Sequence, residues 1–245
     1  MLIILKKAEG RAAFLRLVPK YDVLFDQFRP GVLDRLGLGH AALREANPRL
    51  VICALTGYGQ TGPLAQRAGH DIDYLARAGV LGAQGPSDAP PVPPGFQLAD
   101  VSGGLWCAIA ILGALRERDR TGQGSVLDIA MTDGALGFAS ITLANALAGL
   151  SLRRGDETLT GGIAPYNTYA TKDGLHVALG ALEPKFWMGF CAAVGLEASM
   201  EALMPGPHQV ELKKKVAAIF ANKTRAEWEA FAKQHDVCQI GRAHV

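Results

Sequence analysis

The feature that most constrains the fold is the run RLVICALTGYG at residues 49–59, which is apolar almost without interruption until it ends in glycines. Such a run is typical of a strand that is buried on both faces, and strands of this kind occur in parallel sheets covered by helices. Helix-like spacing at 11–19 precedes a β-prone stretch at 21–28, and a further helical pattern at 40–48 ends in Asn-Pro. The sequence therefore predicts an α/β fold with a doubly wound, Rossmann-like parallel sheet.

The loops after the strands are the expected place for function, because ligands of such sheets bind beyond the carboxyl ends of the strands. TGYGQTGP at 56–63 is such a loop. Residues 80–97 are rich in glycine and proline and predict an irregular segment, which at this length is more often a lid or binding loop than a spacer. From Asp100 the pattern predicts an apolar helix that becomes charged and stops at glycines.

We divide the chain into a partial large α/β domain at 1–134, a helix and linker at 135–162, and a small α+β domain at 163–239. The apolar run 135–150 falls short of the roughly 20 residues that a membrane span needs, so we expect a buried helix. The small domain has a strong hairpin signal followed by three helical patterns. Residues 240–245, IGRAHV, resemble the translation of a sequencing adapter, and we expect them to lie outside the fold.

Composition excludes several classes of function. The formal charge is +2, and the basic residues are scattered, so a nucleic-acid partner is not expected. The four cysteines contain no CxxC pair, which indicates neither a zinc site nor a disulfide framework. We expect a cytoplasmic protein with no metal site and no membrane partner. The three tryptophans stand at helical spacings among apolar residues and are expected in the core.

Three ionisable residues stand out, and each has a structural and a functional interpretation. Asp100 opens a helix and is either an N-cap or a reactive carboxylate. Glu183 precedes a proline and is either a first-turn carboxylate that complements the helix dipole or part of a site. His70 follows a glycine in GHDIDY and is either a hydrogen-bonded structural residue or an acid/base group.

Several segments, taken together and in order, resemble one known family. They are FRPGVLDRLGLG, TGYGQTGP, AGHDIDYLARAGVL, LADVSGG, ALRERDRTGQGSVLDIAMTDG and GGIAPYNTYATKDGLHVALGALEPKFW. The sequence resembles the family III CoA-transferase superfamily (CaiB/BaiF) over residues 20–238, and within it the α-methylacyl-CoA racemases. The resemblance implies a large Rossmann-like domain, a small domain and an interlocked homodimer. Family members have further segments before and after the matched part, so the resemblance implies that this chain is a fragment, which alone could be inactive.

For the chemistry, the resemblance implies two alternatives. In a racemase, His70 and Asp100 flank the carbon next to the thioester, and Glu183 orients His70 and favours its protonated form, in a site between the domains. Inversion needs two such acid/base groups, and backbone N–H groups at the start of the Asp100 helix would stabilise the enolate oxygen. In a CoA transferase, Asp100 is a nucleophile that forms an aspartyl-CoA intermediate. His70 favours the racemase, whereas PPGFQLAD resembles transferase members. A third alternative is a non-catalytic core that pairs with another chain.

The resemblance also implies how coenzyme A is bound. CoA enters as part of the substrate, and no covalently bound cofactor is expected. The predicted binding residues are two arginines, suited to phosphates by their bidentate fork, and the 69–74 motif: Arg29, Arg35, Gly69, Asp71, Ile72, Asp73 and Tyr74. For the two arginines, a solvated surface position is the alternative interpretation.

Overall fold

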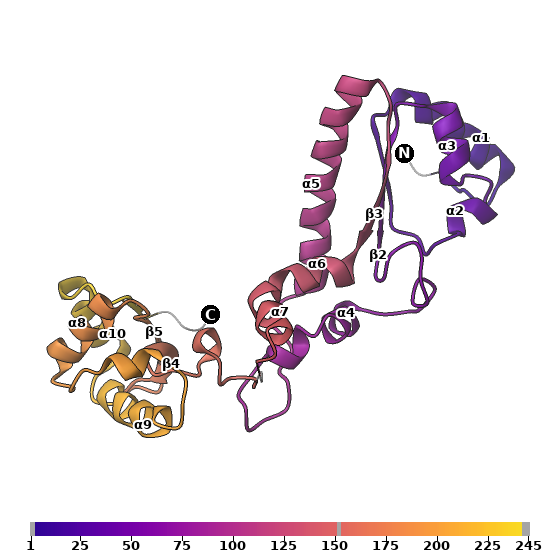
Figure 1. Ribbon diagram of the computed structural model, residues 1–245. Coiled ribbons are helices and arrows are strands. Elements are labelled where there is room, and N and C mark those ends of the chain that lie inside the picture. The colour runs from indigo at the N-terminus through magenta and orange to yellow at the C-terminus, as the bar shows by residue number, and fades with distance from the viewer. Residues whose placement is uncertain (1–2, 151–152, 242–245) are drawn as a thin grey trace. The chain divides into compact units, whose positions relative to one another are not determined.

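A computed structural model describes residues 3–150 and 153–241 (Figure 1). The chain forms two compact units, residues 1–82 with 93–143, and residues 83–92 with 144–245. The segment 80–97, expected as one loop, is thus divided between them. Arg154 ties its middle part to the second unit, because its Nε donates a hydrogen bond to the carbonyl oxygen of Pro86 (3.0 Å).

The first unit is built on a parallel sheet, as the sequence predicts. Its strands are β1 (Val23–Asp26), β2 (Val51–Thr56) and β3 (Val126–Ala130), in the order β1-β2-β3. The central strand β2 is buried at every residue except the half-buried Leu55. Helices cover both faces, with α5 on one side and α1 and α3 on the other (Figure 1). This burial on both faces explains why β2 reads as a continuous apolar run.

The helices of the first unit precede, connect and follow these strands. They are α1 (Ala8–Leu17), α2 (Val32–Arg35), α3 (His40–Ala46), α4 (Asp71–Arg77), α5 (Leu98–Thr121) and α6 (Met131–Phe138), and α7 (Ser140–Leu147) follows at the unit boundary. Short 3₁₀ helices lie at Val18–Lys20 and Leu81–Ala83. One apolar cluster packs α1 and α3 on the sheet, and another packs α4, α5 and α6 together around Leu75 and Ala99.

Helix α5 is the longest element, with 24 residues, and it ends where the sequence predicts, at Gly122 in the left-handed conformation (φ 76°). Among the described residues it is the one helix long and apolar enough to cross a membrane, a test that core helices of soluble proteins also pass. It packs against β2, β3 and α6. Gly103 permits the close contact with α6, because a Cβ there would lie 2.8 Å from Met131 Cγ.

Two expectations about the core are wrong. The run 135–150 does not form one buried helix, because α6 ends at Phe138 and no residue of α7 is buried. Trp106 is 43% exposed, whereas Trp187 and Trp228 are buried as expected. The physical reason is the same in both cases, since apolar composition and spacing indicate a tendency to be buried but not which element would cover the side chain.

The second unit is a small α+β domain. Strands β4 (Tyr166–Ala170), β5 (His176–Gly180) and β6 (Gln239–Ile240) form an antiparallel sheet, with the predicted hairpin turning at Gly174 (φ 74°). Its helices are α8 (Pro184–Val194), α9 (Gln209–Phe220) and α10 (Arg225–Gln234), with 3₁₀ helices at Thr158–Thr160 and Met200–Leu203. Aromatic rings in contact fill the core: Trp187, Phe190 and Phe220 stack, and Trp228 packs against Phe220 with its ring tilted. The expected capping box at Thr224 and Glu227 is present.

The expectation that 240–245 lies outside the fold is wrong for its first two residues. Ile240 pairs with Ala178 in the sheet, and Gly241 is buried. The pairing follows because an extended backbone beside an open strand edge gains hydrogen bonds whatever its side chains are. Residues 242–245 lie outside the described residues.

Candidate functional site

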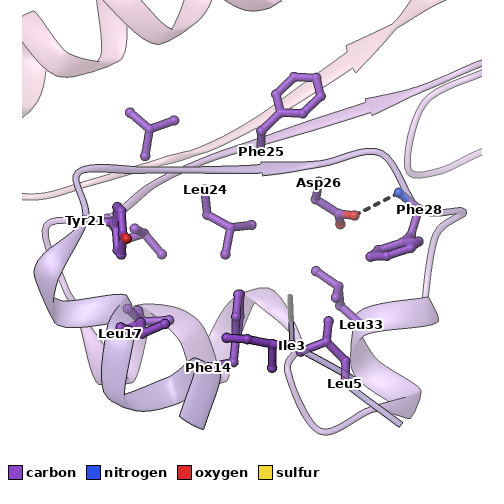
Figure 2. A pocket seen from close by; sticks show the side chains of 13 residues that line it. Ile3, Leu5, Phe14, Leu17, Tyr21, Leu24, Phe25, Asp26, Phe28 and Leu33 are labelled. Carbon is purple, nitrogen blue, oxygen red and sulfur yellow. Dashed lines mark hydrogen bonds between the residues drawn. The ribbon is translucent and has the colours of Figure 1, made fainter. Parts of the chain in front are cut away.

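Two pockets formed by described residues lie in the first unit, and one of them holds some of the predicted site residues. The other, about 370 Å³, lies between α1 and β1 and is lined almost entirely by apolar side chains (Figure 2). Its one carboxylate, Asp26, is already engaged, because it accepts a hydrogen bond from the backbone N–H of Phe28 (2.9 Å) and lies 3.5 Å from His40 Nε2. Among its described lining residues this apolar pocket therefore presents no carboxylate without a partner.

The candidate site is a pocket of about 340 Å³ at the carboxyl ends of the strands. Its walls come from the loop after β1, the end of β2 and the start of α6 after β3. That is the edge at which parallel α/β sheets bind their ligands. The lining residues are Gln27, Phe28, Arg29, Pro30, Leu55, Thr56, Gly57, Ala65, Arg67, Ala68, Gly69, Tyr74, Asp100 and Met131.

Asp100 is the carboxylate of this pocket. It stands at the third position of α5, and its own backbone N–H donates to Asp71 Oδ1 (3.0 Å). It is therefore not the N-cap, which is Gln97, and the structural interpretation of Asp100 is wrong. Partial burial of its carboxyl raises the pKa of Asp100, the negative charge of Asp71 raises it further, and His70 opposes the rise.

His70 occupies the N-cap position of α4, and its backbone N–H donates to Asp73 Oδ2 (2.9 Å). Its side chain is exposed and does not line the pocket, but it lies close enough to Asp100 for its charge to lower the pKa of that carboxyl. The fold thus brings together two of the three residues proposed for catalysis, although thirty positions separate them.

The acidic residues of the 69–74 motif are engaged in helix capping. Asp71 Oδ1 accepts the backbone N–H groups of Ala99 (2.6 Å) and Asp100 (3.0 Å), and Asp73 caps α4 at His70. Neither carboxylate lines the pocket. The expectation that the first N–H groups of α5 are free to stabilise an enolate is therefore wrong for Ala99 and Asp100, because Asp71 already accepts both.

Gly69 and Tyr74 form one wall of the pocket. The Tyr74 hydroxyl donates to the carbonyl oxygen of Gly69 (2.6 Å), and its ring meets Tyr58 edge-on at 5.1 Å. A Cβ at Gly69 would lie 2.7 Å from Tyr74 Cε1, so this position needs glycine. Burial raises the pKa of Tyr74, with nearby Arg29 opposing. Ile72, also predicted to bind CoA, is 46% exposed and does not line the pocket.

Of the two arginines that the sequence predicts, one lines the pocket and the other does not. Arg29 lines the pocket from the loop after β1. Gln66 Nε2 donates a hydrogen bond to the carbonyl oxygen of Pro30 in this loop (3.0 Å). Arg35 ends α2, is exposed and does not line the pocket. Sequence reasoning missed Arg67, which does line it. A basic residue immediately before the AGHD segment was the signal that could have identified it.

Glu183 lies in the second unit, at the N-cap position of α8, with an exposed side chain that makes no capping bond. Its predicted action on His70 stays a prediction. Within the described residues no group of three or more histidine, cysteine or acidic side chains is arranged to hold a metal ion.

A parallel α/β unit with a carboxylate, a nearby histidine and two arginines at the carboxyl ends of its strands belongs to the class of α/β enzymes that bind ligands at this edge. The sequence pattern of CoA-transferase family III matches residues 1–241, and the chain belongs to this family.

Relatives of both chemistries are similar to the chain. It is 40% identical over 237 residues to an α-methylacyl-CoA racemase of Mus musculus, covering 96% of this chain and 62% of the relative. It is 38% identical over 233 residues to an acyl-CoA transferase of Fusarium pseudograminearum, covering 92% of this chain and 50% of the relative. A CaiB/BaiF family protein from Brucella suis has a similar crystal structure, with a TM-score of 0.83 and 28% sequence identity. The match covers 99% of this chain and 65% of that protein. The chain thus spans less than two thirds of these relatives.

Proposed function

We propose that this protein racemises 2-methylacyl-CoA thioesters by proton transfer through an enolate, with His70 and Asp100 as the two acid/base groups. The observation that carries the proposal is the placement of Asp100. Its carboxylate lines the pocket near His70, and Asp100 is not the N-cap residue of α5. Similarity to the racemase of Mus musculus supports the same reaction.

In the proposed reaction one group removes the proton at C2, the electron pair moves onto the thioester oxygen, and the other group returns a proton to the opposite face. Each group then carries the opposite protonation state and is reset by exchange with solvent. The raised pKa of Asp100 suits this role, because a carboxyl closer to the working pH accepts and donates protons more readily. Each such group contributes roughly 10²- to 10⁴-fold in rate.

Coenzyme A is proposed as part of the substrate, with no covalently bound cofactor. Arg29 and Arg67 give the pocket a positive side suited to phosphate or to the thioester oxygen. Phe28, Leu55 and Met131 give it apolar walls suited to an acyl chain. Arg35 is proposed to contact CoA outside this pocket.

We also propose a homodimer in the cytoplasm. Val101, Leu105, Ile109 and Leu112 are each more than half exposed and recur at spacings of four, four and three on α5. This spacing places them on one face of the helix, and an exposed apolar stripe of this kind is typical of an interface. Sedimentation of the wild type and of Leu105→Asp tests this proposal, since a wild-type monomer would contradict it.

The reaction is tested by incubating the enzyme with one epimer of a 2-methylacyl-CoA in deuterated water. Deuterium should enter C2 with loss of stereochemical purity and without any acceptor acid. His70→Ala should abolish the exchange, while His176→Ala, which replaces an exposed histidine of the second unit, should retain it. Full exchange in His70→Ala would remove His70 from the proposed site.

The second candidate is CoA transfer to a carboxylic acid through an aspartyl-CoA intermediate at Asp100, which similarity to the Fusarium pseudograminearum relative favours. Strict dependence on an acceptor acid, together with an intermediate that hydroxylamine traps at Asp100, would establish transfer in place of racemisation.

A further inference from the structure

We infer that Asp71 is a positioning residue, whose carboxylate fixes the helix that carries Asp100 against the helix that His70 begins. Asp71 is the first residue of α4 and follows His70 directly. Its Oδ1 accepts the backbone N–H groups of Ala99 (2.6 Å) and of Asp100 itself (3.0 Å). One side chain thus joins the starts of both helices.

The start of α5 needs such a partner. The first N–H groups of a helix have no acceptor within the helix, and Gln97 at the N-cap makes no side-chain capping bond. A carboxylate accepts these bonds more strongly than a neutral group and also complements the positive end of the helix dipole. Because the acceptor comes from α4, the satisfied geometry exists only when α4 and α5 are correctly placed.

Asp71 also influences Asp100 electrostatically. The charged or titratable groups around Asp100 are Asp71 and His70 at the start of α4, Tyr74 on α4, and Arg29 and Arg67 across the pocket. Asp71 is the one among these whose charge raises the pKa of Asp100, while His70 lowers it. If the proposed proton transfer holds, on which this consequence rests, Asp71 adds to the effect of burial and brings the pKa of Asp100 closer to the working pH.

Two variants separate the geometric effect from the charge effect. Asp71→Asn keeps an oxygen that can accept both N–H groups but removes the charge, whereas Asp71→Ala removes both. Asp119→Asn is the matched control, because it removes an exposed carboxylate near the opposite end of α5. It lies 19 residues from Asp100, roughly 28 Å along the helix.

The first measurement does not depend on activity. Titration of the Asp100 carboxyl by ¹³C NMR should give a lower pKa in Asp71→Asn than in wild type, and an unchanged pKa in Asp119→Asn. Hydrogen exchange at the N–H groups of Ala99 and Asp100 should quicken in Asp71→Ala but little in Asp71→Asn. An Asp100 pKa that does not respond to Asp71→Asn, or exchange that does not respond to Asp71→Ala, overturns the inference.

The second measurement uses the C2 deuterium exchange. Asp71→Ala should lower kcat by roughly 10²-fold with a smaller change in KM, since a misplacement of about 1 Å costs that much. Asp71→Asn should shift the acidic limb of the kcat profile to lower pH. A kcat in Asp71→Ala equal to that of wild type would overturn the positioning role. If wild type exchanges no deuterium while the NMR results hold, the proposed reaction fails and the positioning of Asp100 stands.

Discussion

Replacing Gly57 by alanine should displace Tyr74 and destabilise the first unit. A Cβ at Gly57 would lie 2.3 Å from Tyr74 Cε1, 2.6 Å from Cζ and 2.7 Å from the hydroxyl oxygen. Carbon atoms pack at about 3.5 to 4.0 Å, so the ring must move by roughly 1 Å. Tyr74 is buried, and its hydroxyl is bonded to Gly69, so the ring cannot swing into solvent without breaking that bond. Overpacking of this kind costs about 1–3 kcal/mol of unfolding free energy.

The assay is urea unfolding followed by the backbone amide signals of β2 and α4, which report on the first unit alone. Gly113→Ala is the matched control, because a Cβ there meets nothing within 4 Å in the middle of α5. It should stabilise the unit by roughly 0.5–1 kcal/mol, as alanine is the better helix former. Tyr74→Leu should reduce the cost of Gly57→Ala, since the ring is what the new methyl meets. Unchanged stability in Gly57→Ala, with unmoved Tyr74 signals, would refute the reasoning.

Three further predictions follow from burial and charge. At neutral pH a thiol reagent should label Cys238, which is exposed, but not Cys53, because burial raises the pKa of Cys53 to about 12; rapid loss of all four thiols in the native state would contradict this. Trp228→Ala should lower the unfolding free energy of the second unit by about 3–5 kcal/mol, whereas Trp106→Ala at its exposed site should cost far less, as denaturant titrations of the two variants would show. Asp100→Asn should raise the unfolding free energy at neutral pH. The pKa of the Asp100 carboxyl is raised in the folded state, so its contribution to stability is lost as the pH rises from the unfolded-state pKa through the folded-state pKa. The difference between variant and wild type should disappear in acid, and a difference that is largest in acid would contradict this prediction.

Local patterns in the sequence were sufficient to predict the central strand of the first unit and the hairpin of the second. The apolar run around β2 predicted a buried parallel strand because a strand covered on both faces has no polar positions. The Asp-Gly turn predicted the hairpin because glycine alone readily adopts the positive φ seen at Gly174. These features depend on neighbours within a few residues, so the sequence is enough to specify them.

The candidate site depended on contacts that no local pattern specifies. Arg67 was overlooked, and Arg35 was expected in the pocket, because lining a pocket depends on the path of the loops between strands. The exposed positions of α7 and Trp106 were missed because apolarity does not reveal which element would cover a side chain.

The sequence by itself determined the family, the parallel sheet and the two candidate acid/base residues of the first unit. Only the tertiary structure decided how those residues act on each other. Asp71 and Asp100 are 29 positions apart, and their bond forms because the packing of α4 and α5 brings a free carboxylate to unsatisfied N–H groups. In that contact Asp71 accepts the backbone N–H groups at the start of α5, and the Asp100 side chain lines the pocket.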